Sequence, residues 1–318
     1  MFEGARILIT GGAGFIGSYL VERLLADNDI VTVFDNFSRD ALRGSDAMGH
    51  PRLRVIEGNV LDAEAVARAV DGHDVVFHCA AIAGIDTVGR SPVTTLKVNM
   101  LGSVNVLDAA IAQNHMRRVV CFSTSEVYGR QANRVTEDGD ARVGPPGEPR
   151  WTYAAGKLAE EHLASAYHIE HGLPTVVLRP FNVYGPRQVG EGAIRSFVLN
   201  ALSGEPIEIR GDGNAVRAWT YVDDMVDGAC RAVAAPGAIG DHFNIGNPDE
   251  PITVTDLASK VVFLASSASE IVFKAAEGVD VDERVPNIDK ARAILGFSPS
   301  VDLDEGISLT IKALGARQ

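Results

Sequence analysis

Short apolar runs alternate with longer amphipathic stretches over the first two-thirds of the chain. The apolar runs are rich in valine and isoleucine and lie at residues 6–10, 30–35, 53–58, 74–80, 118–124 and 175–180. Strands of this nearly continuous apolar character are typical of parallel sheets that are buried on both faces. The stretches between them have helical spacing and lie at 15–27, 63–70, 93–114 and 154–171. The alternation predicts an α/β fold with a doubly wound parallel sheet of the Rossmann type.

The regular alternation is lost after residue 180. The later pattern predicts helices at 192–203, 220–235, 254–264 and 287–295, and short strands at 207–210 and 243–245. We therefore expect two units, which the chain enters more than once. The sheet domain would comprise residues 1–180 and about 211–245, and a smaller C-terminal α/β lobe would comprise about 181–210 and 246–318.

The composition is that of an ordinary globular protein with an acidic surface. Of 318 residues, 46% are hydrophobic and 22% are charged. Asp and Glu number 42 against 29 Lys and Arg, which gives a formal net charge of −13. Such a surface repels the phosphates of nucleic acids and of anionic membranes, so we expect neither as a partner.

Compartment and metal content can also be predicted from the sequence. The three cysteines do not form a disulfide framework, and the eight histidines show no metal-ligand spacing. No apolar run has the length of a membrane helix, and no signal peptide is recognised at the start of the chain. We expect a cytoplasmic protein without a bound metal.

A glycine-rich segment, TGGAGFIG (10–17), joins the first predicted strand to the first predicted helix. Gly11, Gly14 and Gly17 suit a tight turn, the approach of backbone N–H groups to a pyrophosphate, and close packing of helix and strand. The N-terminus of the helix adds partial positive charge. Asp35 ends the second strand, where a carboxylate can bind both adenosine ribose hydroxyls and repel a 2′-phosphate. The segment predicts a dinucleotide site that favours NAD over NADP.

Tyr153 and Lys157 lie four residues apart at the start of a predicted helix. Positions i and i+4 share one helix face, so the lysine ammonium can lie near the phenol and lower its pKa. A tyrosine with a lowered pKa can act as a general base near neutral pH. The fifth strand ends in Thr124, Ser125 and Glu126, at the sheet edge where ligands bind in doubly wound folds. We expect these five residues to be catalytic.

Several longer motifs carry a resemblance to a known family. They include TGGAGFIG (10–17), STSEVYG (123–129), YAAGK (153–157), RPFNVYGPR (179–187), RAWTYVDDMVDG (217–228) and RVPNIDKA (284–291). With these motifs the chain resembles the extended short-chain dehydrogenase/reductases, specifically the NAD-dependent nucleotide-sugar epimerases, dehydratases and decarboxylases. The resemblance extends over nearly the whole chain and implies NAD as cofactor and a nucleotide sugar, of UDP type, as substrate.

The resemblance also implies roles for particular residues. It places the cofactor against Gly11, Gly14, Phe15, Ile16, Asp35, Asn36, Asn59, Val60, Ala80, Ala81, Asn99, Ser123, Tyr153 and Lys157. It places the nucleotide diphosphate or the sugar against Asn182, Arg187, Arg210, Arg217 and Arg284. Two positions depart from the family pattern. Asn59 stands where an aspartate usually faces the adenine, and Arg210 stands where an aromatic residue often lies near the nucleobase.

Enzymes that this chain resembles share a first step, in which Tyr153 would take the proton of the sugar 4-hydroxyl while hydride leaves C4 for NAD. The resulting 4-ketone can lose a C6 carboxylate as CO2, eliminate water, or take hydride back on its other face. The triplet Thr124-Ser125-Glu126 resembles UDP-glucuronate decarboxylases and GDP-mannose 4,6-dehydratases, whereas simple 4-epimerases usually carry a small or hydroxyl residue in place of Glu126. Arg217 could face a substrate carboxylate.

These comparisons favour a UDP-glucuronate decarboxylase. The alternative is a UDP-glucose or UDP-glucuronate 4-epimerase, and a further alternative is an NDP-hexose 4,6-dehydratase. A non-catalytic dinucleotide sensor typically lacks the Tyr/Lys pair that this chain has. The resemblance also implies a homodimer, in which the predicted helices 93–114 and 154–171 of two copies form a four-helix bundle.

Overall fold

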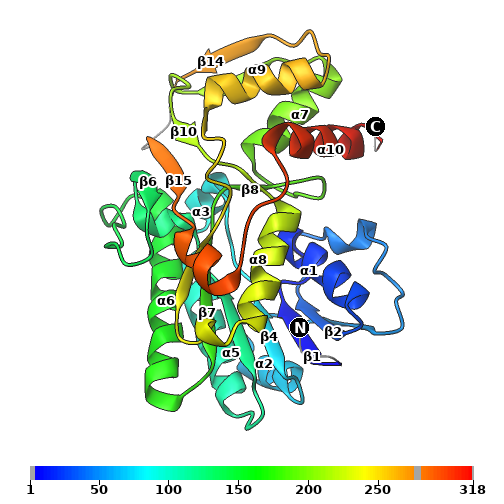
Figure 1. Ribbon diagram of the computed structural model, residues 1–318, viewed down its shortest axis with the longest axis vertical. Helices are drawn as coiled ribbons and strands as arrows, with labels where there is room; N and C mark the ends of the chain where they lie inside the picture. Colours follow the sequence, from blue (N-terminus) through cyan, green and yellow to red (C-terminus); the bar gives the residue numbers. More distant parts are fainter. Residues whose placement is uncertain (1–3, 276–280, 317–318) are drawn as a thin grey trace.

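The computed structural model describes residues 4–275 and 281–316 of the chain. Its centre is a sheet of seven strands in the order β12-β7-β5-β4-β1-β2-β3 (Figure 1). These strands are β1 (Arg6–Thr10), β2 (Ile30–Asp35), β3 (Leu53–Glu57), β4 (Val75–His78), β5 (Arg118–Phe122), β7 (Thr175–Pro180) and β12 (His242–Ile245). All neighbours pair in parallel. The predicted doubly wound parallel sheet is confirmed.

Helices cover both faces of this sheet, which explains why its strands are apolar throughout. On one face, α2 (Ala63–Val70), α5 (Gly102–Ile111) and α6 (Arg150–His171) pack in a row. On the other face, α1 (Phe15–Ala26) packs against α8 (Val222–Ala234). Successive residues of a strand point to opposite faces, so Ile7 and Ile9 lie in the core under α1 and α8 while Leu8 lies in the core under α2 and α5.

The long helix predicted at 93–114 is divided in the structure. It consists of α4 (Pro92–Leu96), a π-helical turn η2 (Lys97–Leu101) and α5, and a short helix α3 (Ile85–Arg90) precedes it. A π-helical turn inserts one extra residue and rotates the side chains that follow it. The apolar spacing of the segment is compatible with an uninterrupted helix, so the sequence pattern alone did not reveal the division.

A second group of helices lies at one end of the molecule, at the top of Figure 1. It consists of α7 (Ala193–Ser203), α9 (Val254–Leu264) and α10 (Leu303–Gly315), which share a core containing Phe197, Leu257 and Ile307. Strand β9 (Ile207–Arg210) pairs in parallel with β14 (Ile271–Lys274) beside them. Helix α10 was absent from the elements predicted from the sequence, although Asp302 caps its N-terminus by accepting a hydrogen bond from the Glu305 N–H.

Several very short strands connect the two groups. A four-stranded sheet has the order β13-β10-β15-β6 and consists of β13 (Ile252–Thr253), β10 (Val216–Arg217), β15 (Glu283–Pro286) and β6 (Gln131–Val135). In addition, β8 (Val183–Tyr184) pairs with β11 (Thr220–Tyr221). The sequence did not predict these strands, because they are two to five residues long and lack the continuous apolar runs that mark the central strands. The sheet nevertheless matters, since β10 and β15 pair in the register that sets Arg217 opposite Arg284.

The remaining described elements are short helical turns. They are η1 (Leu42–Gly44), η3 (Ser125–Tyr128), η4 (Pro236–Ala238) and the π-helical η5 (Ala291–Leu295). Among the described residues, no helix combines the length and the apolar composition that crossing a bilayer requires.

The turn between β1 and α1 generates the first prediction. A Cβ atom on Gly17 would lie 2.4 Å from the carbonyl oxygen of Gly11 and 2.7 Å from the Cα of Gly12, both of them backbone atoms. We expect Gly17→Ala to push α1 away from β1 and to lower the free energy of unfolding by about 1–3 kcal/mol, measured by urea denaturation. Gly89→Ala in α3 is the matched control, because a Cβ at Gly89 has no atom within 4 Å. Equal stability of the two variants would contradict the close packing described here.

Candidate active site

A cavity of about 680 Å³ lies at the carboxyl edge of the seven-stranded sheet. Residues at or just after the ends of β1, β2, β3, β4, β5 and β7 line it. The strand order reverses between β1 and β4, and ligands of doubly wound sheets bind at this switch point. The position of the cavity therefore agrees with the edge at which the sequence predicted the site.

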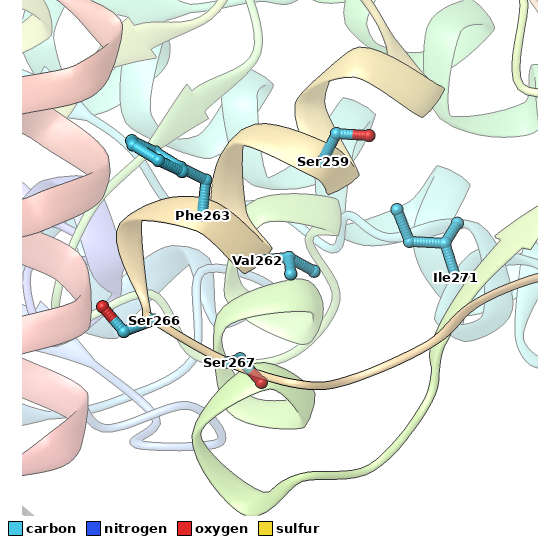
Figure 2. A pocket seen from close by; sticks show the side chains of 6 residues that line it. All are labelled: Ser259, Val262, Phe263, Ser266, Ser267 and Ile271. Atoms are coloured by element: carbon cyan, nitrogen blue, oxygen red, sulfur yellow. The ribbon is translucent and has the colours of Figure 1, made fainter.

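A second hollow, of about 530 Å³, lies beside α9 (Figure 2). It is lined by Ser259, Val262, Phe263, Ser266, Ser267 and Ile271. Figure 2 shows these side chains on α9 and on the segment that follows it. None of them titrates, and the hollow shares no residue with the cavity at the sheet edge, so the chemistry belongs to the latter.

The turn after β1 forms the floor of the cavity. Gly11 has a φ of 70°, and a Cβ at this position would lie 2.5 Å from the backbone nitrogen of Ala80, so only glycine fits. Gly14 is the N-cap of α1, and Phe15 and Ile16 in its first turn line the cavity. Backbone N–H groups and the positive end of the helix thus face a space without side chains in the way. This cradle fits the pyrophosphate of a dinucleotide.

Asp35 lies at the cavity at the end of β2. Its carboxylate accepts hydrogen bonds from the Ala13 N–H at 2.9 Å and from the Phe37 N–H at 2.8 Å. Burial raises the pKa of Asp35 above its ordinary value, although these backbone donors oppose the rise. The neighbouring residues Asn36, Asn59, Val60, Ala80 and Ala81 also line the cavity. The set fits the adenosine half of NAD.

Asn99 is buried in the π-helical turn and does not belong to the cavity lining. Its side-chain amide accepts a hydrogen bond from the Ile82 N–H at 2.9 Å and donates one to the Ile82 carbonyl at 3.2 Å. In this structure Asn99 therefore holds the loop after β4 in place, and a direct role toward the cofactor stays a prediction.

Tyr153 and Lys157 both line the cavity from α6. The Tyr153 phenol is in hydrogen-bonding contact with Thr124 at the end of β5. Burial raises the pKa of Tyr153 above its ordinary value, Lys157 and Thr124 oppose this rise, and Glu160 and Glu126 add to it. Lys157 is itself buried and forms an ion pair with Glu160, with 2.7 Å between Nζ and Oε2. The base predicted from the sequence thus lies beside its predicted partners.

Glu126 lies in a cluster of arginines at the same cavity. Its carboxylate forms an ion pair with Arg284 and lies 3.7 Å from Nη2 of Arg150. Burial alone would raise the pKa of Glu126, but the charges of Arg284, Arg150 and Arg217 outweigh it and hold the pKa below its ordinary value. The three cations keep this carboxylate ionised, and guanidinium groups at a cavity are suited to binding anionic groups.

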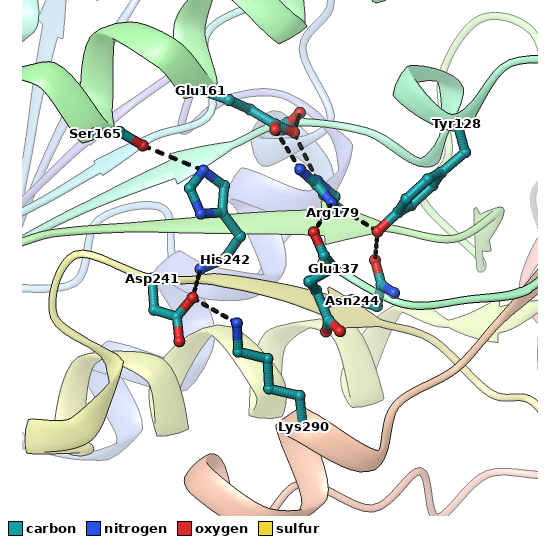
Figure 3. A network of polar contacts seen from close by, with 10 residues as sticks. Tyr128, Glu137, Glu161, Ser165, Arg179, Asp241, His242, Asn244 and Lys290 are labelled. Carbon is teal, nitrogen blue, oxygen red and sulfur yellow. Dashed lines mark hydrogen bonds and ion pairs between the residues drawn. The ribbon is translucent and has the colours of Figure 1, made fainter. Parts of the chain in front are cut away.

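Ser125 and Ser123 are buried at the end of β5, next to this cluster. The Ser123 hydroxyl donates a hydrogen bond to Glu161. Glu161 in turn accepts two hydrogen bonds from Arg179, at 2.9 and 2.6 Å, and Arg179 donates to the Tyr128 hydroxyl at 2.7 Å (Figure 3). Tyr128 continues the network to Asn244 at 2.8 Å. This buried network fixes β5, η3, α6, β7 and β12 relative to one another.

The predicted substrate residues are not all brought together. Asn182 and Arg284 line the cavity, and the Asn182 amide donates a hydrogen bond to the Ala218 carbonyl at 2.7 Å. Arg187 instead forms an ion pair with Glu22 and lies over the Tyr19 ring. Arg210 is 63% exposed. The roles of Arg187, Arg210 and Arg217 toward a substrate stay predictions.

Three residues at or behind the cavity escaped the sequence analysis. Arg150 lies three residues before Tyr153, and Glu160 lies three residues after Lys157, so helical spacing could have pointed to both. Glu191 accepts hydrogen bonds from the backbone of Asp86 and Thr87, more than 100 positions earlier in the chain. No local sequence pattern predicts a contact between residues so far apart in the chain.

Comparisons with known proteins agree with this geometry. A family model described as the NAD dependent epimerase/dehydratase family matches residues 7–246. The UDP-N-acetyl-alpha-D-glucosaminuronate decarboxylase of Bacillus cytotoxicus is 35% identical, over 96% of this chain and 97% of that protein. UDP-glucuronic acid decarboxylase 6 of Arabidopsis thaliana is 37% identical, over 96% of this chain and 87% of that protein.

Solved structures show the same likeness. The UDP-glucuronic acid 4-epimerase of Bacillus cereus, in complex with UDP-glucuronic acid and NAD, has a TM-score of 0.90 at 29% identity, over 98% of this chain and 100% of that chain. The resemblance inferred from the motifs is confirmed, and so is NAD as the cofactor of the family. The chain belongs to the NAD dependent epimerase/dehydratase family.

Proposed function

We propose that this chain is a decarboxylase of a UDP-linked hexuronic acid, with UDP-glucuronate as the first candidate substrate. The observation that carries the proposal is the ionised Glu126 within the cluster of Arg150, Arg217 and Arg284, in the same cavity as Tyr153. The relatives named above at 35% and 37% identity are decarboxylases of UDP-hexuronic acids, which supports the same reaction. The sugars that these two relatives are named for differ in the substituent at C2. Both UDP-glucuronate and UDP-N-acetylglucosaminuronate should therefore be tested.

The first step falls to Tyr153, which takes the proton of the sugar 4-hydroxyl. Thr124 lies within hydrogen-bonding contact of the phenol and can align the same oxygen, and Lys157 supplies the positive charge that favours the phenolate. NAD, when bound along Gly11, Gly14 and Asp35, supplies the hydride acceptor for C4. The product of this step is a 4-keto sugar whose C6 carboxylate is β to the ketone.

The second step breaks the bond between C5 and C6. CO2 leaves, the electron pair enters the enolate of the 4-ketone, and the enolate then takes a proton at C5 from water, because the ionised Glu126 has no proton to donate. The arginine cluster can hold the carboxylate before it leaves, since guanidinium groups bind carboxylates by paired hydrogen bonds. We assign Glu126 to this second step, because its pKa lies below the ordinary value and it is ionised before substrate arrives.

A 4-epimerase is the second candidate. The structural similarity to the Bacillus cereus UDP-glucuronic acid 4-epimerase favours it, because that enzyme was solved in complex with the same UDP-hexuronic acid. The two candidates share the first step and differ only in the fate of the ketone. A 4,6-dehydratase would need a C6 hydroxyl instead of a carboxylate, and the relatives at 35% and 37% identity are decarboxylases of UDP-hexuronic acids, which favours the carboxylate.

The second prediction separates these reactions. We expect the purified protein to release CO2 from UDP-glucuronate or from UDP-N-acetylglucosaminuronate, measured by mass analysis of the nucleotide sugar and by trapped CO2. Tyr153→Phe should lower kcat by about 10³-fold or more, because the base for the 4-hydroxyl is lost. Release of the C4 epimer without CO2 would establish the epimerase instead.

Glu126→Gln separates the two steps within the decarboxylase. The variant keeps the size of the side chain and loses its charge, so the first step should continue and NAD should still be reduced. CO2 release should fall by about 10²-fold. If oxidation and CO2 release fall by the same factor, Glu126 acts in the first step and the assignment above is wrong.

The third prediction concerns the choice of cofactor. Asp35→Ala should weaken NAD binding and reduce the preference over NADP, because the carboxylate that faces the ribose is lost. Asp40→Ala is the matched control, since Asp40 lies near Asp35 without lining the cavity. Dissociation constants for both dinucleotides give the measurement, and equal affinities in the unmodified protein would contradict the assignment.

The fourth prediction concerns a homodimer, which we propose to form through α4, η2 and α6. Val93 and Leu101 are 65% and 51% exposed on the first two elements, which pack beside α6. Leu107, six residues after Leu101, lies in the core and is not available to a partner. We expect a dimer by light scattering at micromolar concentration, and Leu101→Glu should convert it to monomers. Phe263→Glu, at an 80% exposed apolar residue on α9, should leave the mass unchanged.

The cysteines support the proposal that the enzyme works in the cytoplasm. Cys79, Cys121 and Cys230 are free thiols, and the last two are buried. A chain that relies on reduced thiols inside its core suits a reducing compartment.

A further inference from the structure

Glu160 is a buried carboxylate directly behind the catalytic lysine. Lys157 and Glu160 lie on the same face of α6, three residues apart, and their side chains are 1% and 0% exposed. Only 2.7 Å separates the ammonium from Oε2 of the glutamate. Lys157 reaches the cavity wall, whereas Glu160 does not line the cavity. The carboxylate therefore touches neither cofactor nor sugar, and any effect on the reaction passes through Lys157.

The groups that face this ion pair from neighbouring elements are neutral near pH 7. Burial lowers the pKa of His78 on β4 to about 3, and its ring nitrogens contact the hydroxyls of Thr10 and Ser103. Burial also raises the pKa of Cys79 and of Cys121, which keeps both as thiols. Ser103 on α5 lies against the Glu160 carboxylate.

The other nearby charges have partners of their own. Glu161, the next residue of α6, is paired with Arg179, and Glu126 is paired with Arg284. Asp35 is hydrogen-bonded to two backbone N–H groups at the far wall of the cavity. Within the described residues, Glu160 is thus the carboxylate in contact with Lys157.

We propose that Glu160 is a positioning residue: it weakens the electrostatic effect of Lys157 on Tyr153 and thereby sets the protonation of this base. An isolated ammonium beside a phenol strongly favours the phenolate, whereas an ammonium paired with a carboxylate acts as a dipole whose field is weaker. The charge of Lys157 lowers the pKa of Tyr153, and the charge of Glu160 raises it. The pair also fixes the lysine side chain, because burying either charge alone is costly.

The inference rests on the proposed role of Tyr153 as base, but its consequence for the phenol can be measured without turnover. In wild-type protein, Glu160 keeps Tyr153 protonated to a higher pH than Lys157 alone would. In Glu160→Gln, the phenol should lose its proton at a pH lower by about one unit or more. The activity of a base rises with pH through its pKa, so the acid limb of the kcat profile should move down by the same amount.

The experiment is a titration of the full chain, saturated with NAD and labelled with ¹³C at the tyrosine ring carbon that bears the hydroxyl. Tyr153→Phe assigns the Tyr153 resonance among the six tyrosines. Glu160→Asp, which keeps the charge, should titrate close to wild type. Glu161→Gln is the matched control, a buried glutamate at the next position whose partner is Arg179 rather than Lys157. It should leave the Tyr153 titration in place.

The outcomes decide the proposal separately from the reaction assignment. An unchanged or higher Tyr153 pKa in Glu160→Gln overturns the inference, whichever sugar reaction the enzyme performs. If this variant does not fold, the paired replacement of Lys157 and Glu160 by methionine removes both charges at once, a change that buried ion pairs often tolerate. If the charges of Lys157 and Glu160 oppose each other, as proposed, the double variant should have a Tyr153 pKa within about one unit of wild type. A rise of about two units or more would show that Lys157 acts unopposed.

Discussion

A charge that is buried in a protein must be paired, and this constraint shapes the whole region around α6. Three such pairs meet there: Lys157 with Glu160, Arg179 with Glu161, and Arg284 with Glu126. Removing one member would leave an uncompensated charge in a region of low dielectric, at a cost of about 3–5 kcal/mol. The pair of Arg179 and Glu161 connects α6 to β7, and the contact between Arg150 and Glu126 connects the start of α6 to η3. Helix α6 therefore cannot shift relative to the sheet without breaking one of these contacts.

The pairs differ in what they leave for chemistry. The pair of Arg179 and Glu161 is buried, and its hydrogen bonds continue to Tyr128 and Asn244 (Figure 3). This pair therefore stabilises the packing of the elements around it. Of the other two pairs, the first presents only Lys157 to the cavity, whereas both Glu126 and Arg284 line it. A substrate in the cavity would therefore meet side chains that are already paired, and its own charged groups would compete for these partners.

Much of the fold was predictable because it rests on local patterns. The strands that end at Thr10, Asp35 and His78 are continuous apolar runs, and the glycines after Thr10 define the turn at which the cavity forms. The contacts of Glu126 were not predictable in this way, although the residue itself was identified. Its partner Arg284 lies 158 positions away and arrives through the pairing of β15 with β6, a register that no periodicity in the sequence encodes. Glu160 was overlooked because a charged residue on a helix is usually solvated.

The residues of the site that the sequence predicted and the contacts that it did not predict belong to two different parts of the cavity. Tyr153 and Lys157 lie on α6, which packs on the central sheet, and we propose that they serve the oxidation that epimerases, dehydratases and decarboxylases have in common. The cations around Glu126 come from three separate segments, at Arg150, Arg217 and Arg284, and two of these lie on the short strands β10 and β15 that the sequence pattern did not reveal. If the fate of the 4-ketone depends on charge at this second location, as we propose, then the reaction type is encoded in long-range pairing, whereas the family is encoded in local motifs. For this reason the motifs identified the family at once and left the reaction among three candidates.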